Sequence, residues 1–90
     1  MKGGFEGVFP KKEITEKIIG GAFRVHTLLG SGFLEKVYEN ALANELSRLG
    51  FRVDQQKWLD VVYGGEPVGM FHADLLVEKC VVVELKAVKT

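Results

Sequence analysis

The sequence predicts an α+β fold, in which two N-terminal helices precede a mainly antiparallel sheet of three or four strands. Two observations predict it. Apolar residues recur at three- and four-residue spacing through the first half of the chain, and short Val- and Leu-rich runs separated by turn residues fill the second half. Because the helices come before the strands instead of alternating with them, a parallel α/β arrangement is not favoured.

The first helix is predicted from Pro10 to near Gly30. Proline is favoured in the first turn of a helix, and glycine just beyond its end. The apolar positions that mark its buried stripe are Ile14, Ile18, Ala22, Val25 and Leu29. Gly20 and Gly21 lie inside this helix at a cost of about 1 kcal/mol each relative to alanine, which predicts a close helix contact or a bend.

A second helix is predicted from Phe33 to Leu49, with Gly50 as its C-terminal stop. Its broad apolar face consists of Leu34, Val37, Tyr38, Ala41, Leu42, Leu46 and Leu49. Strands are then predicted over residues 52–57, 59–63, 69–77 and 81–88, with Gly64-Gly65 as a hairpin turn. The phenyl, indole and phenol rings of Phe51, Trp58 and Tyr63 are expected to pack between helices and sheet.

Ninety residues with zero formal net charge predict one domain over residues 1–90, preceded by a flexible leader over residues 1–9. The composition favours neither disorder nor a strongly basic nucleic-acid module. Cys80 is the only cysteine, so an intramolecular disulfide is impossible and a reducing, cytoplasmic setting is expected. No apolar run is long enough to cross a bilayer, so no membrane partner is expected.

Charged residues interrupt the last two apolar runs, where Asp74, Glu84 and Lys86 sit among valines and leucines. Ionised groups on such strands need partners. If Glu78 and Lys79 form a plain two-residue turn, Asp74 lies opposite Val83 and the carboxylates face opposite sides of the sheet. If the connection is Glu78-Lys79-Cys80, or carries an equivalent bulge, Asp74 pairs with Glu84 and His72 with Lys86.

Only the second register allows a shared metal ion. Two adjacent carboxylates repel one another unless a cation lies between them, and Mg²⁺ or Mn²⁺ prefers such oxygen ligands. Lys86 would then orient or deprotonate an attacking water, or stabilise the charge of the transition state, as metal-assisted phosphodiester cleavage requires. The alternative interpretation is that Glu84 and Lys86 are a solvated strand face or an ion pair of little energetic weight.

The segments Gly32-Phe-Leu-Glu35-Lys-Val-Tyr38, Asp74 and Glu84-Leu-Lys86 together resemble the GxxExxY proteins of the PD-(D/E)XK nuclease superfamily. The resemblance also includes His26, Gly30 and Gln56. It implies a restriction-endonuclease-like fold and catalytic roles for Glu35, Asp74, Glu84 and Lys86. It further implies that the three carboxylates bind the metal ion, with DNA or RNA as the substrate.

Members of that family usually continue beyond the Glu-x-Lys strand with a further helix and strand, so this chain resembles a truncated version. An uncovered strand 81–88 is expected to cause self-association, as a homodimer or with another chain. The alternative function is therefore a non-catalytic interaction or assembly protein that retains the scaffold.

Tyr38 and His72 are predicted as supporting residues of the site, beside Glu35 and Lys86 respectively. Glu35 also has a simpler explanation, since a carboxylate in the first turn of a helix is stabilised by the helix dipole. His26 is expected to be a packed or capping histidine, and Cys80 a small apolar residue with no depression of its thiol pKa.

Overall fold

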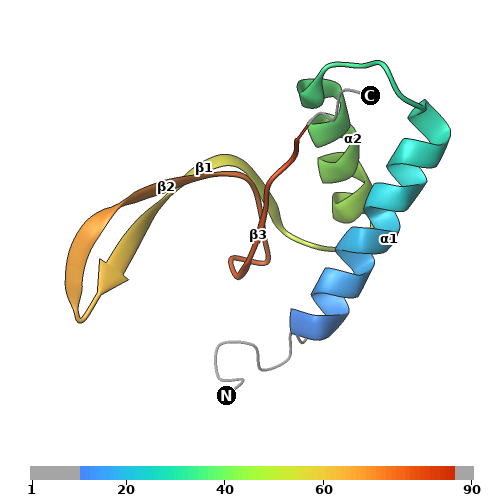
Figure 1. Cartoon of the computed structure of the whole chain (residues 1–90). Helices are drawn as coiled ribbons and strands as arrows, with labels where there is room; N and C mark the ends of the chain where they lie inside the picture. Colours follow the sequence, from blue (N-terminus) through green and yellow to red (C-terminus); the bar gives the residue numbers. More distant parts are fainter. Residues whose placement is uncertain (1–10, 87–90) are drawn as a thin grey trace.

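A computed structural model describes residues 11–86 as two helices followed by three antiparallel strands (Figure 1). The elements are α1 (Lys11–Leu29), α2 (Glu35–Arg48), β1 (Val53–Tyr63), β2 (Glu66–Val77) and β3 (Val81–Val83), with sheet order β1-β2-β3. The α+β prediction is confirmed. The leader over residues 1–9 and the last two residues of the strand predicted over residues 81–88 lie outside the described residues. Of that strand only Val81–Val83 forms, because the chain then leaves the ladder and the Leu85 amide bonds to the Asp74 side chain.

The two helices pack closely where α1 carries a glycine. A Cβ atom on Gly21 would lie 3.3 Å from Leu42 Cδ1 and 3.4 Å from Leu46 Cδ2, whereas one on Gly20 would meet nothing within 4 Å. The predicted close contact therefore exists at one of the two glycines. Arg24 Nε and Glu45 Oε2, 3.0 Å apart, form an ion pair across the same two helices. Neither described helix is long and apolar enough to cross a membrane.

The hydrophobic core lies between the helices and one face of the sheet at its root. Its buried members are Ile14, Ile18, Val25, Leu42, Ala43, Leu46, Phe51, Leu75 and Val77. On β2, Leu75 and Val77 point to this face because side chains alternate along a strand. Their partners in the ladder, Val83 and Val53, pack against the same cluster. Phe51 is buried as expected.

Beyond the core, β1 and β2 continue as a two-stranded ribbon that curves away from the helices (Figure 1). The two short strands predicted over residues 52–57 and 59–63 form one strand, β1. Gly64 and Gly65, with φ of 61° and 84°, make the predicted turn in the type I′ geometry that suits a two-residue hairpin. The predicted packing of Trp58 and Tyr63 between helices and sheet is wrong: they are 60% and 79% exposed, because the helices do not reach the ribbon.

The final hairpin combines both connections that the sequence left open. Glu78 and Lys79 form a two-residue turn, with φ of 54° and 58° and a hydrogen bond of 3.1 Å from the Cys80 amide to the Val77 carbonyl. Cys80 is then an extra residue, so Val77 pairs with Val81, Leu76 with Val82 and Leu75 with Val83. This is the bulged register that brings Asp74 and Glu84 to equivalent positions.

Candidate active site

The two strand carboxylates lie at the end of the β2–β3 ladder. Continuing the register by one residue from Leu75–Val83 puts Asp74 opposite Glu84. Asp74 is half-buried, and its Oδ2 atom accepts a hydrogen bond of 2.8 Å from the Leu85 amide. The Asp74 side chain thus accepts the hydrogen bond that a backbone carbonyl of β2 would accept if the ladder continued past β3. Glu84 is exposed.

Asp74 and the helical carboxylate Glu35 approach the sheet from different sides. Asp74 alternates with Leu75, so it points to the face opposite the one that the helices cover. Glu35 is exposed in the first turn of α2, on the helical side. Within residues 11–86, no group of three or more His, Cys, Asp or Glu side chains is arranged to hold a metal ion.

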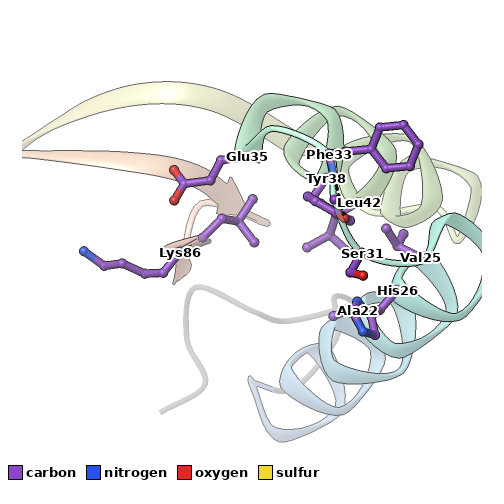
Figure 2. A pocket seen from close by; sticks show the side chains of 11 residues that line it. Ala22, Val25, His26, Ser31, Phe33, Glu35, Tyr38, Leu42 and Lys86 are labelled. Atoms are coloured by element: carbon purple, nitrogen blue, oxygen red, sulfur yellow. Dashed lines mark hydrogen bonds between the residues drawn. The ribbon is translucent and has the colours of Figure 1, made fainter. Parts of the chain in front are cut away.

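Glu35 and Lys86 instead line a cavity of about 340 Å³ between the helices and the segment after β3. The cavity is also lined by the apolar side chains of Ala22, Val25, Leu42 and Leu85, and by His26, Ser31, Gly32, Phe33 and Tyr38. Figure 2 shows Glu35 and Lys86 at the same end of this cavity. His26 is exposed. The structure therefore places Glu35 and Lys86 at one cavity and bonds Asp74 to the Leu85 amide, between Glu84 and Lys86 in the chain.

Tyr38 holds the connection between the helices. Its hydroxyl donates a hydrogen bond of 2.7 Å to the Gly30 carbonyl and accepts one of 3.2 Å from the Phe33 amide. The Phe33 ring packs edge-on against it, with centroids 6.2 Å apart. Tyr38 thereby fixes the backbone that leads into Glu35.

His72 lies opposite Trp58 on the ribbon, and the two rings stack at a centroid distance of 4.7 Å. Near the turn that follows β2, burial raises the pKa of the Cys80 thiol, which Glu78 raises further and Lys11 lowers. The raised pKa agrees with the prediction that Cys80 has no reactive thiolate.

The residue that the sequence did not single out is Glu39, whose carboxylate is 4% exposed between α2 and β1. Its Oε2 atom accepts hydrogen bonds from Gln55 Nε2 (2.7 Å) and Lys36 Nζ (3.2 Å), and Oε1 accepts one from Gln56 Nε2 (2.8 Å). Burial by itself raises the pKa of Glu39, but the hydrogen bonds from Gln55, Gln56 and Lys36 outweigh it, so the pKa is lowered.

Gln56 reaches Glu39 only because its backbone is unusual for a strand residue. Consecutive strand side chains point to opposite faces, yet Gln55 and Gln56 both bind the same carboxylate. The φ of Gln56 is 52°, in the left-handed region, which turns its side chain to the helical face. By the β1–β2 register, Gln56 lies across from Asp74. The spacing of Glu39 four residues after Glu35 was the sequence signal for a second helical carboxylate on that face.

Comparison with protein families gives one match, in which the model of the PD-(D/E)XK nuclease superfamily covers residues 12–90. The chain belongs to the PD-(D/E)XK nuclease superfamily. Comparisons with curated proteins and with solved structures gave no match. Nucleases of this superfamily generally use divalent metal ions, and the two helices with the three-stranded antiparallel sheet are consistent with a PD-(D/E)XK-like α+β fold.

Proposed function

We propose that this PD-(D/E)XK chain is a metal-dependent nuclease that hydrolyses phosphodiester bonds of DNA or RNA. The observation that carries the proposal is the bulged β2–β3 register, since an unbulged turn would separate Asp74 from Glu84. Family membership over residues 12–90 supports the same reaction class. The resemblance to GxxExxY proteins, carried by Gly32, Glu35 and Tyr38, supports that narrower assignment.

The side chains fit a hard divalent cation such as Mg²⁺ or Mn²⁺. Asp74 and Glu84 would face one another if the register were extended by one residue beyond Leu75–Val83, and both carry carboxylate oxygens. Mg²⁺ in proteins is often held by only one or two carboxylates with waters and substrate phosphates. The family resemblance also implies Glu35 as a third ligand, but Glu35 lies on the helical side of the sheet and Asp74 on the other, so we propose the ion on Asp74 and Glu84. When bound, such an ion would supply Lewis-acid stabilisation of the negative charge on the phosphate.

The remaining chemistry falls to Lys86 and Asp74. Lys86 shares the cavity with Glu35, and we assign it the orientation or deprotonation of the attacking water. Asp74 keeps Oδ2 on the Leu85 amide, one residue before Lys86, so the same carboxylate positions the backbone that carries the lysine. His72 and Tyr38 are supporting residues in this proposal.

Cleavage of labelled single- and double-stranded DNA and RNA tests the proposal, with Mg²⁺, Mn²⁺ or a chelator present. Lys86→Ala and Glu84→Gln should each lower the cleavage rate by at least about 100-fold with folding unchanged. Lys17→Ala, exposed on α1, and Asp60→Asn, exposed on the ribbon, are matched controls and should retain the rate. Cleavage that survives both site variants or the chelator would contradict the proposal.

A second candidate function is a non-catalytic interaction or assembly protein on the same scaffold. The observation that favours it is that residues 11–86 hold no group of three potential metal ligands. Self-association as a homodimer belongs to either proposal. We also propose a cytoplasmic setting, which the single unpaired cysteine, Cys80, supports.

A further inference from the structure

The ribbon of β1 and β2 beyond the core has two faces, and each is lined by exposed apolar side chains. We call the first the ribbon face; it comprises Lys57, Leu59, Val61, Tyr63, Glu66 and Phe71, paired as Leu59–Phe71 and Tyr63–Glu66. The second, the opposite face, comprises Trp58, Asp60, Val62, Met70 and His72. A two-stranded ribbon is marginally stable in water unless something covers it. The ribbon therefore favours a partner.

We propose that the ribbon face docks face to face on the same face of a second copy of this chain, with the two ribbons antiparallel about a two-fold axis. The ribbon face continues the sheet surface that Leu75 and Val77 present to the helices. The helices cover that surface at its root and leave it bare along the ribbon (Figure 1). The ribbon of a second copy would cover the part of this surface that the helices do not reach.

Charge decides between the two faces. The ribbon face has Lys57 at its root and Glu66 at its tip, so a two-fold antiparallel arrangement brings each lysine to the glutamate of the second copy. The opposite face has Asp60 near its middle, across from Met70, and the same symmetry would bring two aspartates together. Self-association is therefore favoured on the ribbon face alone. A nucleic-acid partner is disfavoured, because the charges Lys57, Asp60 and Glu66 leave the ribbon with a net negative charge.

Shape supports the same arrangement. We place the two-fold axis between the Leu59–Phe71 pair and the Val61–Gly69 pair. The Leu59–Phe71 pair of each copy then lies against the Val61–Gly69 pair of the other copy. A Cβ atom at Gly69 would meet nothing within 4 Å, so the surface is open there. Phe71 and Val61 are each 42% exposed, and can fill that space.

The surface available is enough for a modest dimer. The six side chains of the ribbon face expose on the order of 500 Å² per copy, or roughly 1,000 Å² in total, which is the lower limit for a specific interface. Affinity in the micromolar range is expected for so small an area. The dimer should thus appear and disappear over an accessible range of concentration.

The experiment uses two neighbouring valines as a matched pair. Sedimentation or light scattering of the whole chain from roughly 1 to 200 µM should show reversible dimers, which Val61→Glu weakens by at least about tenfold. Val62→Glu makes the same chemical change on the opposite face and should leave the affinity within roughly threefold. A monomer at every concentration, or a larger effect of Val62→Glu, would overturn the proposal.

Charge reversal tests the arrangement even if Val61→Glu fails to fold. Lys57→Glu and Glu66→Lys should each weaken the dimer, and the double variant should restore it; two additive losses would overturn the antiparallel arrangement. Trp58, the only tryptophan, lies on the opposite face, so its fluorescence detects burial of that face. Its emission should stay constant through dimerisation, whereas a blue shift would place the contact on the wrong face.

Discussion

Glu39 is a buried carboxylate held by two neutral donors and one charged donor, and its lowered pKa makes the stability of the chain sensitive to acid. Gln55 and Gln56 supply amide donors, and Lys36 adds one charged donor from the helix surface. These three donors lie 2.7–3.2 Å from the carboxylate oxygens, and residues 11–86 contain no buried side-chain nitrogen or oxygen without a partner. Glu39 therefore joins α2 to β1 next to Gln56, the β1 residue that lies across from Asp74.

Glu39→Gln should lower the free energy of unfolding by about 1–3 kcal/mol at neutral pH, because the new amide group sets donors against the donors of Gln55 and Gln56. Because the pKa of Glu39 is lower in the folded than in the unfolded chain, its ionised carboxylate stabilises the wild type at pH values above the ordinary pKa of a glutamate. This stabilisation is lost as the pH falls through the folded-state pKa. The wild type and variant should therefore converge in acid.

Urea unfolding of both proteins between neutral pH and pH 3 measures this convergence. Glu16→Gln, an exposed change on α1, is the control and should track the wild type. A stability gap between wild type and Glu39→Gln that stays constant in acid would show that the Glu39 charge is not the cause.

At the scale of elements, the helices were predictable and the strands only in part. Gly30 and Gly50 follow the ends of α1 and α2 within two residues, as predicted, because helix stop signals act locally. The alternation of residues could not reveal that the helices stop short of Trp58 and Tyr63, since exposure depends on the third dimension. Nor could it reveal whether Cys80 is a turn residue or a bulge.

The candidate site shows the same division. Asp74, Glu84 and Lys86 were identifiable because charges on apolar strands are unusual, and Glu35 came from the family resemblance. The left-handed backbone of Gln56, which turns a second glutamine to Glu39, follows from no local sequence signal. A glutamine carries no marker for positive φ, in contrast to the glycines of the Gly64-Gly65 turn.

The contact of α1 with α2 gives a prediction on two adjacent glycines. Gly20→Ala should raise the free energy of unfolding by up to about 1 kcal/mol, because alanine favours the helix and the position is open. Gly21→Ala should gain less, since its Cβ meets Leu42 Cδ1 at 3.3 Å and the neighbour must shift.

Thermal unfolding followed by circular dichroism compares the two variants, with about 4–8 °C expected per kcal/mol in a chain this size. An equal gain at both positions would mean that the close contact at Gly21 is not maintained in solution.

At the scale of the whole molecule, metal binding should couple to folding. If Asp74 and Glu84 hold Mg²⁺ or Mn²⁺, an ion concentration of 100 times Kd should stabilise the folded chain by about 2.7 kcal/mol through mass action. The melting temperature should therefore rise with metal concentration in the wild type.

Asp74→Ala should abolish that rise, whereas Asp60→Ala, which removes an exposed carboxylate of the ribbon, should keep it. Differential scanning calorimetry with millimolar Mg²⁺ and Mn²⁺ makes the comparison. A shift of equal size in wild type and Asp74→Ala would assign the metal effect to other residues.

The long ladder of β1 and β2 has a consequence for local opening. Backbone pairing runs from Val53–Val77 to Tyr63–Glu66, with a register shift between Val61 and Val62, but the apolar core lies only at the first end. Amide protons near Val77 should then exchange with solvent only as the domain unfolds, and those near the Gly64-Gly65 turn through small fluctuations that leave the domain intact. The free energy of local opening would thus fall along one strand pair from the core to the turn. If a second copy covered the ribbon, the free energies of opening at the two ends would become more similar.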